Sequence, residues 1–287
     1  MNRPLGRLIL IIAALALIVV GVSSFQAAER GGKLRLWFFD VGQGDAILID
    51  TPNQQQILID GGPNAAVLGE LAKAMLLTDK TIDLIISTHN DADHLSGLNE
   101  VLKHYEVGKI WLTGAIHTTK TYQNFLELVA AKQIPTETVL AGAVIEFGEL
   151  SGIVISPFVD YEGSIPGKQN IAGIVTFWQY GEQTFLLTAD VEAAQEQEMI
   201  RRNVLRHATI LKVPHHGSTT SSSAAFLEAV TPEVAVIQVG KDNRYNHPAA
   251  AVLARLEQYI PTILRSDRDG TIRFELSTAS YTYKTGL

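Results

Sequence analysis

The stretch Ser87-Thr88-His89-Asn90-Asp91-Ala92-Asp93-His94 decides the fold of this chain. It follows directly on the apolar run Ile82–Ile86, which is typical of a buried strand in a sheet covered on both faces. Loops at the carboxyl ends of such strands are where these sheets hold ligands. Apolar residues from Leu95 to Leu102 recur at helical spacing, so we expect Asp93 and His94 to open a helix. Two imidazoles and two carboxylates thus converge within six consecutive residues, which predicts a metal site.

A simpler interpretation of this stretch is a polar helix start, in which Asp93 caps the helix and both histidines are solvated. Capping explains one aspartate, however, and leaves the other three groups without a role. We therefore favour the metal site.

The composition limits which groups can hold a metal. The chain has 287 residues, 46% of them hydrophobic and 18% charged, which is ordinary for a globular α/β protein with one large core or two modest ones. It contains no cysteine, which excludes both a disulfide framework and thiolate ligands. A metal site must therefore be built from His, Asp, Glu or Asn.

The charge of the chain argues against indiscriminate binding to nucleic acid. The formal net charge is −7, and residues 1–28 contain two arginines and no acid. The remainder holds 21 basic and 30 acidic side chains, a charge of −9. If nucleic acid is the substrate, a local basic patch or the metals themselves must attract it.

The N-terminal segment, residues 1–28, is predicted to be a signal peptide or a signal anchor. Arg3 and Arg7 precede an uninterrupted apolar run of 15 residues, from Leu8 to Val22. Small residues after the run permit cleavage, whereas extension to Ala28 would give an anchor that spans a bilayer. Positive charge on the amino side keeps that end in the cytoplasm, so we expect the catalytic body to be extracytoplasmic in either case, secreted or membrane-anchored.

Two further strands end in potential ligands. The apolar run Phe185–Ala189 delivers Asp190, for which the alternative role is an N-cap of the next helix. The run Ile210–Pro214 leads to His215 and His216. Because adjacent side chains of a regular strand point in opposite directions, we expect only one of these histidines to reach a metal.

The motifs resemble those of a known family. The pattern H-x-D-x-D-H at 89–94 resembles the H-x-H-x-D-H signature of the metallo-β-lactamase superfamily, with Asp91 in place of the second histidine. Followed by His-His-Gly-Ser at 215–218, it resembles the extracellular nuclease-like domain of the ComEC family of competence proteins. D-V-G-Q-G-D at 40–45 and Asn-x-Tyr-x-His-Pro at 243–248 are also similar to that family. By spacing alone, the former is a hairpin turn and the latter a helix start.

The resemblance spans residues 33–275 and implies a fold and a metal centre. The implied fold is α/β, a four-layer αββα sandwich over residues 33–287 that follows the N-terminal hydrophobic segment. Two divalent metal ions are implied, Zn²⁺ or Mn²⁺, with Mg²⁺ also compatible because Asp91 and Asn170 make one site rich in oxygen. The implied ligands are His89, Asp91, Asp93, His94, Asp190 and His215, with Asp190 bridging the two ions and His215 preferred over His216. Asp60, Asn170 and Asp45 are expected to support the ligands or to add to them.

The activity implied is that of an outward-facing, metal-dependent phosphodiesterase or nuclease that uses a hydroxide bridging the two ions. Asp93, His216 and His247 are expected to take part in catalysis, the histidines as candidate acids at the leaving group. The expected partners are a phosphodiester or nucleic-acid substrate and, if the N-terminal segment stays uncleaved, the membrane. Two alternatives remain, a small-molecule ester, lactone or β-lactam hydrolase of the same fold and a non-catalytic DNA-uptake accessory module.

Overall fold

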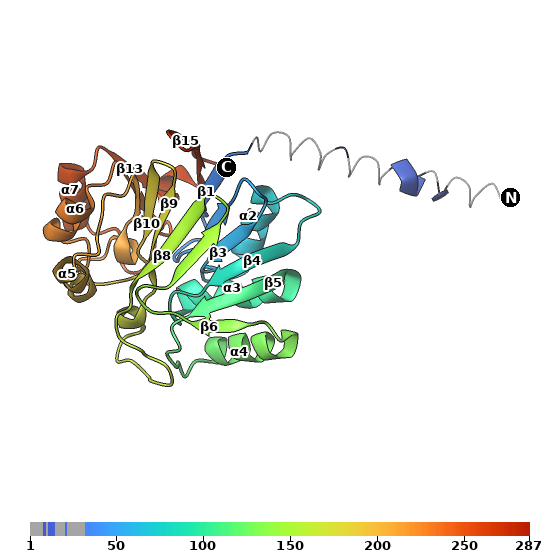
Figure 1. Cartoon of the computed structure of the whole chain (residues 1–287), viewed down its shortest axis with the longest axis horizontal. Helices are drawn as coiled ribbons and strands as arrows, with labels where there is room; N and C mark the ends of the chain where they lie inside the picture. The colour runs from blue at the N-terminus through green and yellow to red at the C-terminus, as the bar shows by residue number, and fades with distance from the viewer. Residues whose placement is uncertain (1–7, 10, 15–20, 22–31) are drawn as a thin grey trace.

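Two mixed sheets pack face to face in this protein (Figure 1). The structure is a computed structural model that describes residues 8–9, 11–14, 21 and 32–287. The first sheet has eight strands, which in spatial order are β15 (Tyr281–Lys284), β14 (Ile272–Leu276), β1 (Leu34–Phe38), β2 (Ile47–Asp50), β3 (Gln56–Ile59), β4 (Thr81–Ile86), β5 (Glu106–Leu112) and β6 (Thr136–Thr138). The second has seven, which are β13 (Thr262–Arg265), β12 (Val234–Ile237), β11 (Ile210–Lys212), β10 (Gln183–Leu187), β9 (Val175–Tyr180), β8 (Leu150–Ser156) and β7 (Val144–Phe147).

One half of each sheet is parallel. In the first sheet β3, β4, β5 and β6 run parallel. In the second sheet β10, β11, β12 and β13 do so. The helices that connect these strands are α2 (Ala66–Ala74), α3 (Ala92–His104) and α4 (Lys120–Lys132) in the first half, and α5 (Ala193–Arg201), α6 (Ala224–Val230) and α7 (Ala250–Tyr259) in the second. Parallel strands end at the same edge, so the loops that follow them meet there.

Three apolar clusters hold these layers together. One lies between the two sheets, one between the first sheet and helices α2, α3 and α4, and one between the second sheet and helices α5, α6 and α7. Strand β2 shows the alternation that makes this possible, since Ile47 and Ile49 point between the sheets while Leu48 points toward the helices. The order of layers is therefore helix, sheet, sheet, helix, and Figure 1 shows the two helical layers on opposite sides.

Some boundaries differ from the sequence-based expectations. The spacing of Val67, Leu71 and Ala74 predicts an amphipathic helix over residues 64–77, but α2 covers only Ala66–Ala74. The sequence also predicts a strand around residues 134–140, of which only Thr136–Thr138 pair with β5 and form β6. The pair Asp269-Gly270 predicts a turn, and in the structure this turn follows a short helix, α8 (Ser266–Asp269).

The prediction of a signal peptide or anchor falls largely on residues outside the described part of the chain. It stays a prediction. Among the residues that the structure describes, no helix combines the length and the apolar character needed to cross a membrane.

Candidate metal centre

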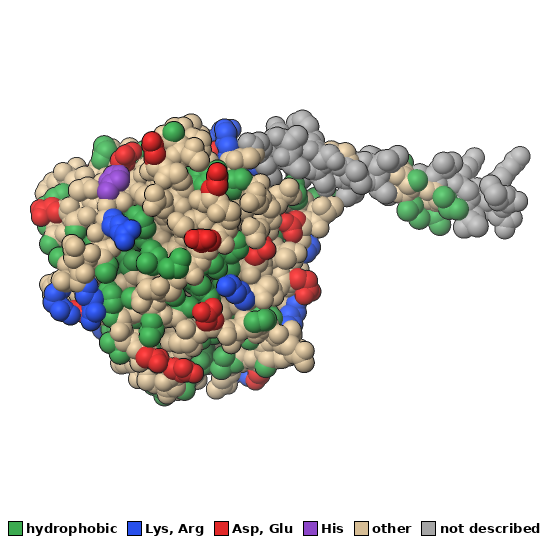
Figure 2. Space-filling view, viewed as in Figure 1, with side chains coloured by type: hydrophobic (Ala, Val, Ile, Leu, Met, Phe, Trp, Pro, Cys, Tyr) green, Lys and Arg blue, Asp and Glu red, His purple; other side chains and the backbone are tan. Residues whose placement is uncertain are grey.

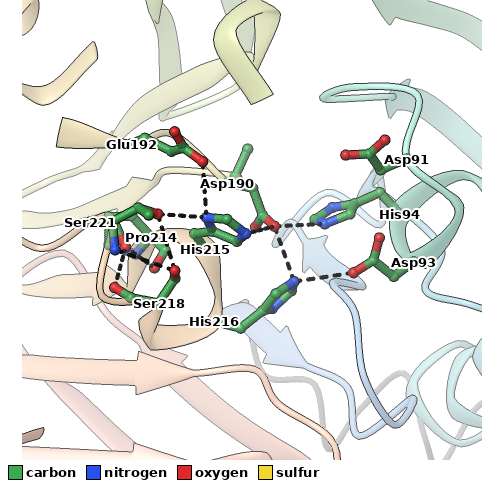
Figure 3. A network of polar contacts seen from close by, with 12 residues as sticks. Asp91, Asp93, His94, Asp190, Glu192, Pro214, His215, His216, Ser218 and Ser221 are labelled. Carbon is green, nitrogen blue, oxygen red and sulfur yellow. Dashed lines mark hydrogen bonds and ion pairs between the residues drawn. The ribbon is translucent and has the colours of Figure 1, made fainter. Parts of the chain in front are cut away.

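The ends of four strands bring the candidate residues to one edge of the molecule. Asp60 follows β3, residues 87–94 (here called the metal loop) follow β4, Asp190 follows β10, and His215 and His216 follow β11. The strands of each pair, β3 with β4 and β10 with β11, are parallel neighbours. Figure 3 shows the rings of His94, His215 and His216 around the carboxylate of Asp190.

Asp60 fixes the metal loop. Its Oδ1 accepts a hydrogen bond from the backbone N–H of Thr88 at 2.8 Å, and its Oδ2 accepts one from the Thr88 hydroxyl at 2.6 Å. The same Oδ2 lies 2.8 Å from Nδ1 of His94. The other ring nitrogen, Nε2, lies 3.4 Å from Oδ2 of Asp190. Asp60 is fully buried, so it orients the His94 ring from the side opposite Asp190.

Glycines allow the start of α3 to touch the loop after β3. The N–H of Gly61 donates to the carbonyl oxygen of His94 at 2.8 Å, and the N–H of Gly97 donates to that of Gly62 at 2.9 Å. A Cβ atom on Gly97 would lie 1.8 Å from the carbonyl oxygen of Gly61. Any larger residue there would push away the helix that carries His94.

The loop at 40–45 packs on the metal loop in a similar way. Gly44 has φ +145°, and a Cβ atom there would lie 2.0 Å from the carbonyl oxygen of Asp93. The N–H of Asp45 donates to the same carbonyl at 3.3 Å. This close approach brings the carboxylate of Asp45 beneath the candidate ligands, where its Oδ1 lies 3.4 Å from Nδ1 of His216.

Three histidines present the same ring nitrogen without a hydrogen-bond partner. Their Nδ1 atoms contact the protein, in His89 at the hydroxyl of Thr88 (3.0 Å), in His94 at Asp60 (2.8 Å) and in His216 at the carbonyl oxygen of Gln238 (2.8 Å). Within the described residues, each Nε2 atom is buried and lacks a hydrogen-bond partner. Histidines that ligate metals are held in this way, with one nitrogen anchored and the other directed at the ion.

A complete set of metal-ligating groups surrounds these nitrogens. Asp93, His94, Asp190 and His216 each offer one ligand atom, and all four atoms lie within 4.8 Å of one another. A second, overlapping group joins Asp60 and His89 to His94. Imidazole nitrogen and carboxylate oxygen are ligands that Zn²⁺ and Mn²⁺ both accept. The donor set therefore fits a divalent cation.

The expectation that His215 and His216 point in opposite directions is wrong. Both residues adopt the left-handed conformation, with φ 50° and ψ 45° at His215 and φ 53° and ψ 22° at His216, inside the 3-10 turn η2 (Pro214–Gly217). This turn replaces the regular strand end, so both rings face Asp190. Nε2 of His216 lies 3.2 Å from Oδ2 of Asp190, and Nε2 of His215 lies 3.8 Å from the same atom. The structure groups His216 with the other candidate ligands.

The remaining predicted ligands lie beside this group. Nε2 of His89 is 3.5 Å from Oδ2 of Asp91, whose side chain is 39% exposed. Asp91 and Asn170 together line a hollow of about 360 Å³ next to the four-residue group. Asn170, in the 3-10 turn η1 (Gln169–Ala172), is 8% exposed. Asp91 also lines the hollow that Asp190 and His216 line, so it stands between the two spaces. His89, Asp91 and Asn170 thus add further nitrogen and oxygen donors beside the four-residue group.

Lys212 belongs to the centre and was missed by the sequence analysis. Its side chain is fully buried, and its Nζ lies 2.5 Å from Oδ2 of Asp45 and 3.5 Å from Oδ1 of Asp190. It also donates to the carbonyl oxygen of Ala189 at 3.0 Å. Lysine therefore faces Oδ1 of Asp190, whereas the imidazoles face Oδ2. The signal was present in the sequence, because Lys212 is a single charge inside an apolar run that reads as a buried strand.

Charges within the group determine how its members titrate. Burial opposes charge on His94 and His216, yet the neighbouring Asp190 raises the pKa of both imidazoles well above the usual value. Burial likewise opposes ionisation of Asp190, but His216, His94 and Lys212 hold its pKa well below the usual value. The buried carboxylate of Asp190 thus favours positive charge on the groups around it.

His215 and His247 lie at the open side of the centre. Both line a hollow of about 300 Å³ together with Asp91, Asp93, Asp190 and His216. Burial lowers the pKa of each imidazole, which favours the neutral form. Nδ1 of His215 lies 3.2 Å from the hydroxyl of Thr220, which leaves Nε2 directed toward the hollow. The two rings are therefore positioned to contact a molecule bound above the centre.

Comparisons with known proteins agree with this geometry. The profile of the metallo-beta-lactamase superfamily matches residues 39–241. ComE operon protein 3 of Bacillus subtilis (strain 168) is 31% identical over 252 residues, which cover 82% of this chain and 32% of that protein. Competence protein ComA of Neisseria gonorrhoeae is 27% identical over 266 residues, which cover 91% of this chain and 35% of that protein. The chain spans about a third of the length of these relatives.

A solved structure has a similar fold. The metallo-beta-lactamase fold protein YhfI from Bacillus subtilis superposes with a TM-score of 0.56 at 12% sequence identity, over 85% of this chain and 100% of that one. At this identity the likeness concerns the fold alone.

Proposed function

This chain belongs to the metallo-β-lactamase superfamily, and from that premise we propose that it is a metal-dependent hydrolase of phosphodiesters. The observation that carries the proposal is the convergence of Asp93, His94, Asp190 and His216, in which two buried Nε2 atoms have no hydrogen-bond partner among the described residues. The motifs at 89–94 and 215–218, which resemble a nuclease-like domain, favour a phosphodiester over other substrates of this fold.

We assign the binding of the metals to two sets of residues. Asp93, His94, Asp190 and His216 would hold one ion. His89, Asp91 and Asn170 would hold a second, with Asp190 shared between the two. Divalent cations in such a centre neutralise charge on the phosphoryl group and generate a nucleophile from water at neutral pH. An oxygen-rich second set is compatible with Mn²⁺ as well as Zn²⁺.

The protein's own groups then handle substrate and protons. His215 is held by Thr220 through Nδ1 and points Nε2 into the hollow over the centre. Its lowered pKa keeps the ring neutral at pH 7, so it can accept a proton or donate an N–H hydrogen bond to the substrate. His247 lines the same hollow, with its ring centroid 5.8 Å from that of His215, so it can take the same roles.

The proposal is tested by hydrolysis of a substrate panel. The metal-loaded chain is assayed on bis(p-nitrophenyl) phosphate and a single-stranded oligonucleotide, beside a lactone, a carboxylic ester and a β-lactam. We expect hydrolysis of the phosphodiesters, loss of activity with a chelator and its return on addition of Mn²⁺ or Zn²⁺. Hydrolysis of an ester or lactone alone would assign the centre to small molecules, and no hydrolysis at all would favour an accessory role.

We also propose that the hydrolase domain faces outward. The support comes from Arg3 and Arg7 ahead of the apolar run 8–22. A fusion to a reporter enzyme that is active only outside the cytoplasm should therefore be active when it is joined after residue 287. An inactive reporter in a fusion that is produced at full length would contradict the outward orientation, and removal of residues 1–28 from an active fusion should abolish its reporter activity.

A further inference from the structure

A second hollow adjoins the candidate metal centre. It has a volume of about 400 Å³ and is lined by Gln43, Pro63, Ala92, Asp93, Asn243, Arg244 and Tyr245. Gln43, Ala92, Asp93 and Tyr245 also line the hollow directly over the centre. The two spaces therefore adjoin each other at these four residues, and a substrate whose reacting group lies over the centre is within reach of the second space.

Asn243 holds the loop that presents Tyr245. Its Nδ2 donates to the carbonyl oxygens of Gly240 (3.0 Å) and His247 (2.6 Å). Its Oδ1 accepts from the N–H groups of Tyr245 (3.1 Å) and His247 (3.0 Å). One side chain thus closes the turn with four hydrogen bonds. The tyrosine is presented from a fixed turn, so little ordering is needed when a ligand binds.

Tyr245 is exposed although it is aromatic and lies beside a polar centre. Its exposed fraction is 48%. Its ring is within 19° of parallel to that of His247, at a centroid distance of 5.8 Å. The guanidinium of Arg244 donates to the Tyr245 hydroxyl at 2.7 Å and lies 4.9 Å from the ring centroid, so it sits toward the hydroxyl end of the ring. The aromatic ring of Tyr245 and the guanidinium of Arg244 are thus both available to a ligand, next to each other.

Arg244 places a positive charge close to the metal centre of a chain whose net charge is negative. Residues 29–287 carry a net charge of −9, and on the face shown in Figure 2 acidic and basic side chains are interspersed. A polyanion therefore needs a local cation near the centre. Arg244 is such a cation, and it lines the hollow that leads to Asp93.

We propose that the loop 240–248 forms a nucleotide subsite, in which Tyr245 stacks on a base and Arg244 contacts a phosphate next to the scissile one. The inference rests on the proposed phosphodiesterase activity and narrows its substrate to a strand with accessible bases. Aromatic side chains stack on unpaired bases of any sequence, whereas bases in a duplex are stacked on each other. Single-stranded nucleic acid is thus the substrate class that the loop fits.

The first test compares two substrates with the same leaving group. Thymidine 5′-(p-nitrophenyl phosphate) carries a base, and methyl p-nitrophenyl phosphate does not. We expect the ratio of their kcat/KM values to favour the nucleotide and to fall roughly 10- to 100-fold in Tyr245→Ala, the range of base stacking on an aromatic residue. Tyr245→Phe should keep the ratio. Tyr283, which is 44% exposed on β15 and lines neither hollow, supplies the control Tyr283→Ala.

The second test measures binding without turnover. A fluorescein-labelled oligothymidylate with hydrolysis-resistant phosphorothioate linkages is titrated with the metal-loaded chain at several salt concentrations. Tyr245→Ala should weaken binding roughly 10-fold or more. Arg244→Gln should weaken it and reduce the slope of log affinity against log salt by about 0.7, the share of one phosphate contact with a single strand.

The outcomes separate this inference from the proposed function. If the chain hydrolyses phosphodiesters while Tyr245→Ala leaves both the substrate ratio and the oligonucleotide affinity within twofold, the subsite is overturned and the hydrolase stands. If no phosphodiester is cleaved but binding still depends on Tyr245 and Arg244, the proposed hydrolase fails and the nucleotide subsite stands. An unchanged salt slope in Arg244→Gln would remove Arg244 from the phosphate contact.

Discussion

His216 places its Nε2 atom 3.2 Å from Oδ2 of Asp190. Its opposite nitrogen, Nδ1, lies 2.8 Å from the carbonyl oxygen of Gln238, which can only accept a hydrogen bond. Nδ1 therefore carries a hydrogen in both charge states of the ring. The raised pKa of His216 keeps a second proton on Nε2 in the metal-free centre, and loss of that proton leaves the neutral tautomer with its lone pair on Nε2. This is the tautomer that a metal ligand needs. His215 is turned differently, because its Nδ1 contacts a hydroxyl and its Nε2 is 3.8 Å from Asp190.

Replacement of His216 should therefore affect metal binding, whereas replacement of His215 should affect turnover. We expect His216→Ala to lose bound metal, whereas His215→Ala keeps metal and loses about 10²–10⁴-fold in turnover, the usual contribution of a proton-transferring group. Metal content is measured beside phosphodiesterase rates, with circular dichroism to check folding. Loss of metal in His215→Ala with retention in His216→Ala would restore the assignment that the sequence suggested.

Lys212 should stabilise the metal-free centre. Lys212→Met leaves the buried carboxylates of Asp45 and Asp190 without their cation, and removing one partner of a buried ion pair costs about 3–5 kcal/mol. We expect urea denaturation with a chelator present to show this loss. Adding Asp45→Asn should recover part of it, since one of the two stranded charges is removed. A cost below about 1 kcal/mol would mean that Lys212 contributes only as a surface ion pair does.

Asp91 should influence which metal is bound. Asp91→His adds an imidazole beside His89 and should shift the preference from Mn²⁺ toward Zn²⁺, because nitrogen ligands suit zinc better than manganese. Competition between the two ions is measured by metal analysis after dialysis against both. Asp160→His, in the loop before η1, serves as the control. If both variants bind the ions in the wild-type ratio, Asp91 does not touch the metal.

Gly97 should be needed for stability as well as for the site. A Cβ atom there meets the backbone of Gly61, so Gly97→Ala should destabilise the protein by about 1–3 kcal/mol or more. Gly69 in α2 has nothing within 4 Å of an added Cβ, so Gly69→Ala should be neutral or stabilising by about 0.4–1 kcal/mol. Urea denaturation gives both values. Equal effects of the two substitutions would show that α3 adjusts freely over Gly61.

Much of the site follows from strand ends that are visible in the sequence. His89, Asp93 and His94 come directly after the apolar strand β4, and Asp190 comes after the apolar strand β10. Each strand belongs to the parallel half of its own sheet, and the two sheets pack face to face with these strand ends at the same edge. The apolar runs likewise predict buried strands, whereas the four-layer arrangement was implied by the resemblance to the metallo-β-lactamase superfamily.

The features that the sequence did not predict depend on backbone conformation and on long-range contacts, which patterns in a single sequence do not reveal. The orientation of His215 and His216 depends on two consecutive left-handed residues, a conformation rare outside glycine. Lys212 pairs with Asp45, which lies 167 positions earlier in the chain, and such contacts exist only once both sheets have formed. Strand β6 is short because only three residues reach β5.

The most direct test of the metal centre is the metal content of the purified chain. Wild-type protein and Asp190→Ala are loaded with Zn²⁺ or Mn²⁺, desalted and analysed by plasma mass spectrometry. We expect wild type to retain at least one ion per chain and Asp190→Ala to retain none, because Asp190 contacts every imidazole of the four-residue group. Wild type without metal, or Asp190→Ala with as much metal as wild type, would contradict the account.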